Sequence, residues 1–321
     1  MATPDADFAS ILVPVDGSPL AEQALPYAAA LASKNTTIRL LLVLRDPEPV
    51  RDLLGRETIS REDVLNQWRD AATASLHQLA ERTRQYAGDL VFDVEVTVGD
   101  PAEQILKVAQ ERGIDLIVMT SHGRGAAGRM VYGSVADRVM RNAPLPVMMI
   151  RPEDAAPERG VAAIRRLVVP LDGSAVAAQA LPVAKQLARH LHTPVQLVSV
   201  IDVYRDLSPA AAYGMAFSQQ IYDEMETYAK QQTQQMLMKA AEHVAAGDVA
   251  VSWTVLSGPT APAIMDTTRP GDIIVLTSHG RGGLKRWLIG SVAEKLMRES
   301  PAPLVLLRAK DAGDSESGAS E

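Results

Sequence analysis

A seventeen-residue segment occurs twice in this chain. Thr120–Ala136 reads TSHGRGAAGRMVYGSVA and Thr277–Ala293 reads TSHGRGGLKRWLIGSVA, with eleven identical positions at an offset of 157 residues. Chance does not produce such agreement, so the chain contains two copies of one unit. Each copy has the length of an ordinary domain, which is too long for a solenoid repeat. Each copy therefore carries one glycine-containing loop that could bind an anion.

The repetition extends to the first apolar segment of each copy. Ile11–Asp16 (ILVPVD) and Leu167–Asp172 (LVVPLD) are both followed by Gly-Ser. This pattern predicts a buried strand, a tight turn and a helix, with Ser18 at the helix N-cap. Both helices then contain a Leu-Pro pair, at Leu25-Pro26 and Leu181-Pro182. A proline at that place is expected to kink the helix or to remove a hydrogen bond from it.

Strands and helices alternate along the rest of each copy. Further strands are predicted at 38–44, 92–98, 115–119 and 146–150, and at 195–201, 249–255, 272–276 and 303–307. Helices are predicted at 60–87, 102–112 and 134–141, and at 218–246 and 261–269. One apolar face of the helix 60–87 is predicted to contain Val64, Leu65, Trp68, Leu76 and Leu79. Near-continuous apolar strands between helices indicate a parallel sheet that is covered on both faces.

The predicted fold class is therefore α/β, with two tandem doubly wound domains of five parallel strands each. Domain one is expected at 1–152 and domain two at 165–310, joined by a linker at 153–164 whose first half is polar. The segment 311–321 is rich in Ser, Gly, Asp and Glu and is expected to be a disordered tail.

Composition excludes several classes of function. The net charge of −7 argues against nucleic acid as the main partner, since phosphate neutralisation needs clustered Lys and Arg. The chain has no cysteine, so it has no disulfide, thiolate metal site or cysteine nucleophile. Its start lacks the pattern of a signal peptide, and no apolar run is long enough for a membrane span. We therefore expect a cytoplasmic, soluble protein without a membrane partner.

Two features are predicted at the carboxyl ends of apolar strands, where open parallel sheets bind ligands. Asp16 follows the first strand, and the segment Thr120–Gly125 follows the fourth. A glycine-rich turn that leads into a helix gathers backbone N–H groups at the positive end of the helix, which favours phosphate. Asp16 could accept hydrogen bonds from a base or a ribose, and Ser134 could donate one to phosphate. In the alternative, Gly123 and Gly125 only form a tight turn, while Ser134 and Asp16 only cap helices.

These residues resemble the universal stress protein family in its tandem form, over nearly the whole of both copies. The family's ATP-binding pattern is G-x2-G-x9-G-[S/T]. Its latter part matches Gly123 with Gly133-Ser134, and Gly280 with Gly290-Ser291. The first glycine of the pattern is replaced by threonine in both copies, at Thr120 and Thr277. The copies also differ from each other, because Gly-Asp-Pro at 99–101 becomes Gly-Pro-Thr at 258–260.

The resemblance implies the strand order 3-2-1-4-5, a fold of the adenine-nucleotide alpha-hydrolase type, and ATP as the ligand, accompanied by Mg²⁺. It also implies pairing of the two copies as an intramolecular pseudo-dimer, with room for a further homodimer, and protein partners that the sequence does not identify. The site residues it implies in copy one are Pro14, Val15, Asp16, Leu44, Met119, Thr120, Gly123, Arg124, Gly125, Gly133, Ser134 and Val135. Those in copy two are Pro170, Leu171, Asp172, Val200, Leu276, Thr277, Gly280, Arg281, Gly282, Gly290, Ser291 and Val292.

Three functions fit these observations. The first is an ATP-binding stress-response or signalling module that binds the nucleotide rather than turning it over. The second is a slow ATPase, for which the loop histidines His122 and His279 are the only candidate bases and no catalytic residue is assigned. The third is a nucleotide-free interaction scaffold, in which Thr120 and Thr277 have closed the sites.

Overall fold

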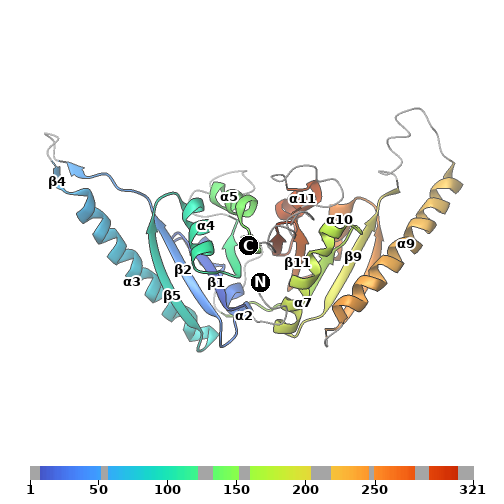
Figure 1. Ribbon diagram of the computed structural model, residues 1–321, viewed down its shortest axis with the longest axis horizontal. Helices are drawn as coiled ribbons and strands as arrows, with labels where there is room; N and C mark the ends of the chain where they lie inside the picture. The colour runs from blue at the N-terminus through green and yellow to red at the C-terminus, as the bar shows by residue number, and fades with distance from the viewer. Residues whose placement is uncertain are drawn as a thin grey trace, which may run out of the picture. The chain divides into compact units, whose positions relative to one another are not determined.

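The computed structural model describes residues 8–51, 57–121, 133–151, 160–203, 218–245, 249–278 and 289–309. The chain divides into two compact units, Met1–Ala163 and Ile164–Glu321. Each unit is an α/β domain in which helices pack against a parallel sheet (Figure 1). The predicted linker at 153–164 and the predicted tail at 311–321 lie largely outside the described residues.

Unit one has five parallel strands in the order β5-β2-β1-β6-β7. The strands are β1 (Ser10–Val15), β2 (Thr37–Leu44), β5 (Val91–Val98), β6 (Leu116–Thr120) and β7 (Val147–Ile150). The helices are α1 (Pro19–Glu22), α2 (Leu25–Leu31), α3 (Arg61–Ala87), α4 (Pro101–Glu111) and α5 (Ser134–Asn142). A small antiparallel pair, β3 (Val50–Arg51) and β4 (Glu57–Ile59), lies between β2 and α3 in sequence.

Unit two repeats this arrangement in the order β10-β9-β8-β11-β12. The strands are β8 (Arg166–Pro170), β9 (Val195–Ile201), β10 (Val251–Ser257), β11 (Asp272–Thr277) and β12 (Leu304–Leu307). The helices are α6 (Ala175–Ala178), α7 (Ala180–Leu191), α9 (Gln219–Ala245), α10 (Thr260–Thr267) and α11 (Ser291–Glu299). When the main-sheet strands are numbered along each copy, both sheets have the expected order 3-2-1-4-5.

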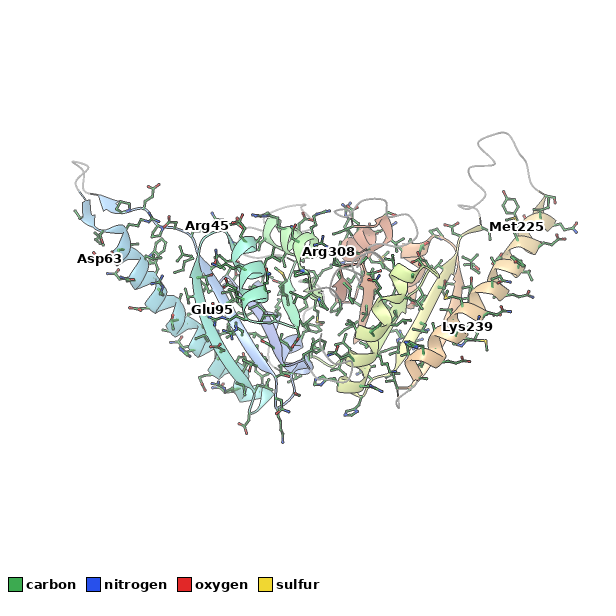
Figure 2. The ribbon with its side chains drawn as sticks, viewed as in Figure 1. Arg45, Asp63, Glu95, Met225, Lys239 and Arg308 are labelled. Atoms are coloured by element: carbon green, nitrogen blue, oxygen red, sulfur yellow. The ribbon has the colours of Figure 1, made fainter. Side chains whose placement is uncertain are left out.

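The core of each unit lies on the two faces of its sheet. In β1 the side chains of Ile11, Leu12 and Val13 are fully buried although they alternate between the faces, and β6 is buried along its whole length. Two-sided burial requires helices on both faces, and it explains why these strands read as continuous apolar runs. Side chains fill the space between helices and sheet, whereas Met225 and Lys239 point outward from α9 (Figure 2).

The single helix predicted around each Leu-Pro pair is interrupted before that pair, so two helices follow the first strand of each unit. The first helix ends at Glu22, and a separate helix begins at Leu25 with Pro26 in its first turn. In unit two, α6 ends at Ala178, and Pro182 falls in the first turn of α7. The backbone nitrogens of a first turn have no partner within their helix, so proline costs nothing there.

The apolar face predicted for α3 is only partly buried, because Trp68 is 46% exposed. Val64, Leu76 and Leu79 are buried, and Leu65 is half-buried. The N-terminal half of α3 extends past the sheet beside β4, where there is less surface to pack against (Figure 1). The periodicity therefore identified the helix face correctly but not how much of it the sheet covers.

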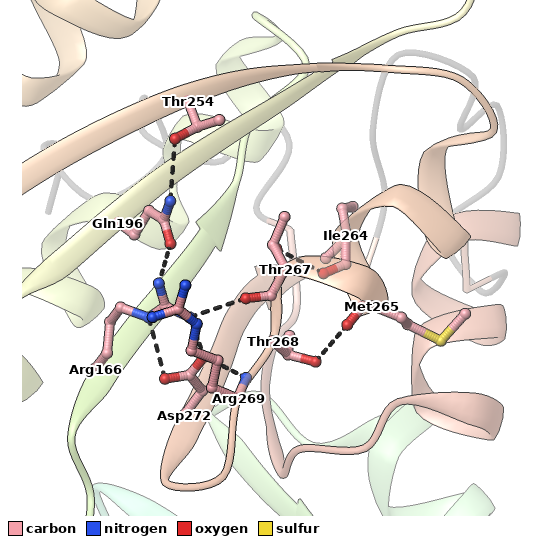
Figure 3. A network of polar contacts seen from close by, with 9 residues as sticks. All are labelled: Arg166, Gln196, Thr254, Ile264, Met265, Thr267, Thr268, Arg269 and Asp272. Atoms are coloured by element: carbon pink, nitrogen blue, oxygen red, sulfur yellow. Dashed lines mark hydrogen bonds and ion pairs between the residues drawn. The ribbon is translucent and has the colours of Figure 1, made fainter.

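The amino-terminal ends of the two central strands are held together by different contacts in the two units. In unit one, Asp115 Oδ2 accepts hydrogen bonds from the backbone N–H groups of Ala9 (2.8 Å) and Ser10 (3.0 Å). In unit two the equivalent Asp272 pairs with Arg166, the first residue of β8 (Figure 3).

The guanidinium of Arg166 is the centre of a network of polar contacts at this edge (Figure 3). It donates to the Thr267 carbonyl (2.9 Å) and to the Gln196 side chain, while Asp272 also accepts from Arg269 N (2.8 Å). The side chain of Asp272 is only 3% exposed and that of Arg166 is 19% exposed. Each charge therefore depends on the other for its solvation.

We predict that Asp272→Ala lowers the free energy of unfolding of unit two by about 3 kcal/mol, because it leaves the half-buried guanidinium of Arg166 without its counter-charge. Urea denaturation measures the loss, and hydrogen exchange of peptides from the second unit assigns it. The control is Asp93→Ala, which removes one of the two carboxylate partners of Arg39; the side chain of Asp93 is 47% exposed. We expect that change to cost less than about 1 kcal/mol. Equal effects of the two substitutions would contradict the assignment.

Candidate functional site

The order of the strands creates a switch point in each sheet. In unit one the chain runs from β1 outward through β2 to β5, and then returns to place β6 on the other side of β1. The connections after β1 and after β6 therefore diverge at the carboxyl edge, and ligands bind there in open parallel sheets. The residues that end these strands, Val15 and Thr120, are both buried. Leu171 and Thr277 occupy the equivalent positions in unit two and are also buried.

Asp16 lies in the turn that follows β1. Its Oδ1 accepts a hydrogen bond from Ser18 N at 2.9 Å, across Gly17 with φ of 78°. The cap of α1 is Ser18, whose hydroxyl accepts from Ala21 N at 3.2 Å. Asp16 therefore stabilises the turn. The alternative in which Asp16 caps the first helix is wrong, because Ser18 is the cap.

Unit two repeats this turn around Asp172. Its Oδ1 accepts from the backbone N–H of Ser174 at 2.9 Å and from the Ser174 hydroxyl at 2.6 Å, and Gly173 has φ of 80°. Ser174 in turn accepts from Ala177 N at 3.0 Å and caps α6. Both carboxylates are half-buried, and each is held at the carboxyl edge of its central strand.

Both ends of the segment that follows the fourth strand are tied to the sheet. In unit one Ser121 N donates to Ile150 O (2.8 Å) and Gly133 N donates to Ser121 O (2.8 Å). In unit two Ser278 N donates to Leu307 O (2.7 Å) and Gly290 N donates to Ser278 O (2.6 Å). The intervening candidates lie outside the described residues: His122, Gly123, Arg124, Gly125, His279, Gly280, Arg281 and Gly282.

The threonines that replace the first glycine of the pattern are the last residues of β6 and β11. The side chains of Thr120 and Thr277 are 6% and 5% exposed, respectively. Both residues have extended backbone, which a β-branched residue adopts readily. The strand conformation therefore does not require glycine at either position.

Helix α5 begins at Ser134 and helix α11 at Ser291, directly after the segment that follows the fourth strand of each unit. The N-cap residues are Gly133 and Gly290, both with extended backbone, and neither helix has a hydrogen bond from a capping side chain. The alternative that Ser134 caps α5 is wrong, because Ser134 is the first helical residue and is exposed. Ser291 is in the same position on α11. Each N-terminus thus presents first-turn N–H groups and a serine hydroxyl at the positive end of the helix dipole.

Apolar residues surround these polar groups. The predicted candidates Val15, Met119, Leu171 and Leu276 are buried, whereas Pro14, Leu44, Val135, Pro170, Val200 and Val292 are half-buried. The register shows one candidate that the sequence missed. Gly99 N donates to Leu44 O at 2.9 Å, and Gly258 N donates to Ile201 O at 2.9 Å. Ile201 is therefore the structural equivalent of Leu44, and Val200 occupies the position of Val43.

The rim of the site in unit one contains an ion pair that sequence reasoning also missed. Asp100 caps α4 by accepting from Glu103 N (3.0 Å), and Arg138 of α5 donates to Asp100 Oδ2 (2.8 Å) and to Glu103 Oε1 (3.3 Å). The hydrogen bond from Glu103 N and the nearby Arg138 lower the pKa of the Asp100 carboxyl. Asp100 was recognisable as an N-cap before proline, but nothing in the sequence indicated its pairing with Arg138.

No helix in the described ranges is both long and apolar enough to cross a membrane. Within the same ranges, no group of three or more His, Cys, Asp or Glu side chains is placed to hold a metal ion.

The sequence of the chain matches those of known proteins along nearly its whole length. The sequence profile of the universal stress protein family matches residues 8–151 and again residues 163–308. The chain belongs to this family. It is 28% identical over 313 residues to universal stress protein Rv2005c of Mycobacterium tuberculosis, covering 93% of this chain and 96% of the relative. Because that alignment spans both copies, the tandem arrangement is shared.

Two further likenesses extend this result. A single-copy universal stress protein from the QAH/OAS sulfhydrylase 3′ region of Thermus aquaticus is 34% identical over 148 residues, which is 45% of this chain and 99% of the relative. The crystal structure of a universal stress protein from Archaeoglobus fulgidus has a TM-score of 0.62 at 19% identity, covering 94% of this chain and 99% of that one. The latter shows that the fold is shared.

We predict that Asp100 titrates below the usual range of an aspartate, because its charged form accepts from Glu103 N and from Arg138. A lowered folded pKa means that the contribution of this carboxylate to stability is present above the unfolded pKa of about 3.9 and is lost as the pH falls through the folded value. An NMR titration of the Asp100 carboxyl measures this. A midpoint for Asp100 at or above about 3.9 would contradict the prediction.

Proposed function

We propose that this tandem universal stress protein binds ATP, with one site at the carboxyl edge of each sheet, and that binding rather than turnover is its activity. The observation that carries the proposal is the recurrence of one constellation in both units. In each unit, a turn-bound aspartate follows the first strand, and a helix with serine as its first residue and no side-chain cap follows the fourth strand, on either side of the switch point of a parallel sheet.

The phosphate end of the ligand is assigned to the N-termini of α5 and α11. First-turn N–H groups and the helix dipole attract an anion, and glycine at the N-cap lets a phosphate approach the backbone closely. Ser134 and Ser291 add a hydroxyl that can donate to a phosphate oxygen. The glycines at 123, 125, 280 and 282 are part of this proposal through the sequence pattern alone.

The nucleoside end is assigned to the ends of the first and second strands. Asp16 and Asp172 are suited to accept hydrogen bonds from ribose hydroxyls or from the adenine amino group. The half-buried Leu44 provides apolar surface beside Asp16 on which a base can pack, and its equivalent Ile201 is buried at the end of β9. We further propose that Mg²⁺ arrives with the nucleotide, that the protein acts in the cytoplasm, and that another protein detects the bound state.

We predict that the double substitution Ser134→Glu with Ser291→Glu abolishes ATP binding. A carboxylate at the first helical position repels the phosphates, yet it favours the helix because it lies at the positive end of the dipole. Calorimetric titration with ATP and Mg²⁺, after removal of co-purified nucleotide, measures the result. The wild-type chain is expected to show two sites.

The matched control is Ser75→Glu, which places the same change at an exposed position of α3. It should leave both sites intact, and circular dichroism should show that all variants fold. The proposal fails if the folded wild-type protein gives no heat at several temperatures. Undiminished affinity in the double variant would remove the helix N-termini from the proposal.

A further inference from the structure

The two candidate sites differ in the charge of their rims. On α5, Arg138 lies one helical turn after Ser134, and on α11 Lys295 lies one turn after Ser291. Residues four apart on a helix share a face, with their Cβ atoms about 5–6 Å apart. Each unit therefore carries a cation on the same helix face as the serine assigned to the phosphates.

In unit one this cation is held by the neighbouring helix. Arg138 donates to Asp100 Oδ2 at 2.8 Å and to Glu103 Oε1 at 3.3 Å, and both carboxylates belong to the N-terminal end of α4. The pKa of Arg138 is raised, because the hydrogen bond and charge of Asp100 favour the charged guanidinium. We call this set of contacts between Arg138, Asp100 and Glu103 the rim bridge.

In unit two the residues that would form such a bridge are replaced. The register of β10 aligns Gly258 with Gly99, so Pro259 and Pro262 stand where unit one has Asp100 and Glu103. Neither proline carries a charge, and α10 has no side-chain cap in the described structure. The ion pair described for Lys295 joins Glu299 on its own helix, at the long distance of 4.0 Å.

Gly99 of unit one and its equivalent Gly258 of unit two also differ in the side chains that lie next to them. A methyl group built at Gly99 would meet the Gln104 side chain, with Nε2 at 3.1 Å. The equivalent of Gln104 in unit two is Ala263, and a methyl group at Gly258 would meet none of the described residues within 4 Å. Among the residues that the structure describes, Gln104 therefore covers Gly99 in unit one, and no side chain covers Gly258 in unit two.

We propose that the two nucleotide sites are unequal, and that the rim bridge is the cause. It withholds Arg138 from the phosphates in unit one, whereas Lys295 is available to them in unit two. Unit two is then the tighter site, and unit one gains Arg138 only when Asp100 and Glu103 release it. This inference rests on the proposed function.

The experiment uses full-length chains in which one site has been blocked. Ser291→Glu leaves the site of unit one and Ser134→Glu leaves that of unit two, and ATP with Mg²⁺ is titrated into each at low salt. We expect the site of unit two to bind about threefold more tightly, the scale of exposed charge interactions. The difference should shrink at 1 M salt, where the Debye length is about 3 Å.

Asp100→Asn in the Ser291→Glu background tests the bridge itself. Asparagine caps a helix as well as aspartate does, so α4 is retained while the nearer of the two carboxylate charges that hold Arg138 is removed. We expect affinity for ATP to rise about threefold. Asp89→Asn removes one exposed charge from the same unit without touching the bridge, and it should change nothing.

A double-mutant cycle separates release of Arg138 from a general change in charge. In the presence of Arg138→Gln, the gain from Asp100→Asn should disappear. Conversely, Pro259→Asp with Lys295→Arg in the Ser134→Glu background should build an equivalent bridge in unit two and weaken ATP binding there. Aspartate fits at position 259 because Pro259 already has the extended backbone of Asp100.

Equal affinities of the two single-site chains, or a gain from Asp100→Asn that persists without Arg138, would overturn the inference and leave the proposed function standing. If neither single-site chain binds ATP although both are folded, the proposed function fails and the inference fails with it.

Discussion

Burial of a parallel sheet on both faces is the constraint on which the rest of this structure depends. The central strands are apolar along most of their length because helices cover them from either side, so polar groups of these strands collect where the strands begin and end. At one edge Asp115 and Asp272 join the central strands, and at the other Asp16 and Asp172 stabilise the turns toward the helices. The carboxyl edge is also where the strand order opens the sheet to a ligand.

Duplication shows which parts of this arrangement can change. The turns after β1 and β8 keep the same aspartate, glycine and serine, and in both turns these side chains accept the same hydrogen bonds from backbone N–H groups. The amino-terminal edge keeps its aspartate but exchanges the partner, from backbone N–H groups in unit one to the side chain of Arg166 in unit two. Either kind of partner provides the carboxylate with hydrogen bonds, so both arrangements are compatible with the fold.

Much of the fold could be predicted from the residues, because strand burial and helix caps are local properties. The helix that starts after Ser60 and the cap at Ser18 were predicted to within a residue. The predictions failed where the outcome depended on neighbours distant in sequence. The exposure of Trp68 depends on how far the sheet extends. The equivalence of Ile201 with Leu44 depends on the register of β10. The pairing of Arg138 depends on how α4 packs on α5.

The separation of the two edges has a consequence for how such a protein can evolve. Contacts that fix the strands lie at one end of the sheet, and groups that can meet a ligand lie at the other, with a layer of apolar side chains between them. A substitution at one end thus has few means of disturbing the other. After duplication, each copy could drift in ligand preference without losing its fold, so a single chain can hold two sensors tuned to different concentrations of one metabolite.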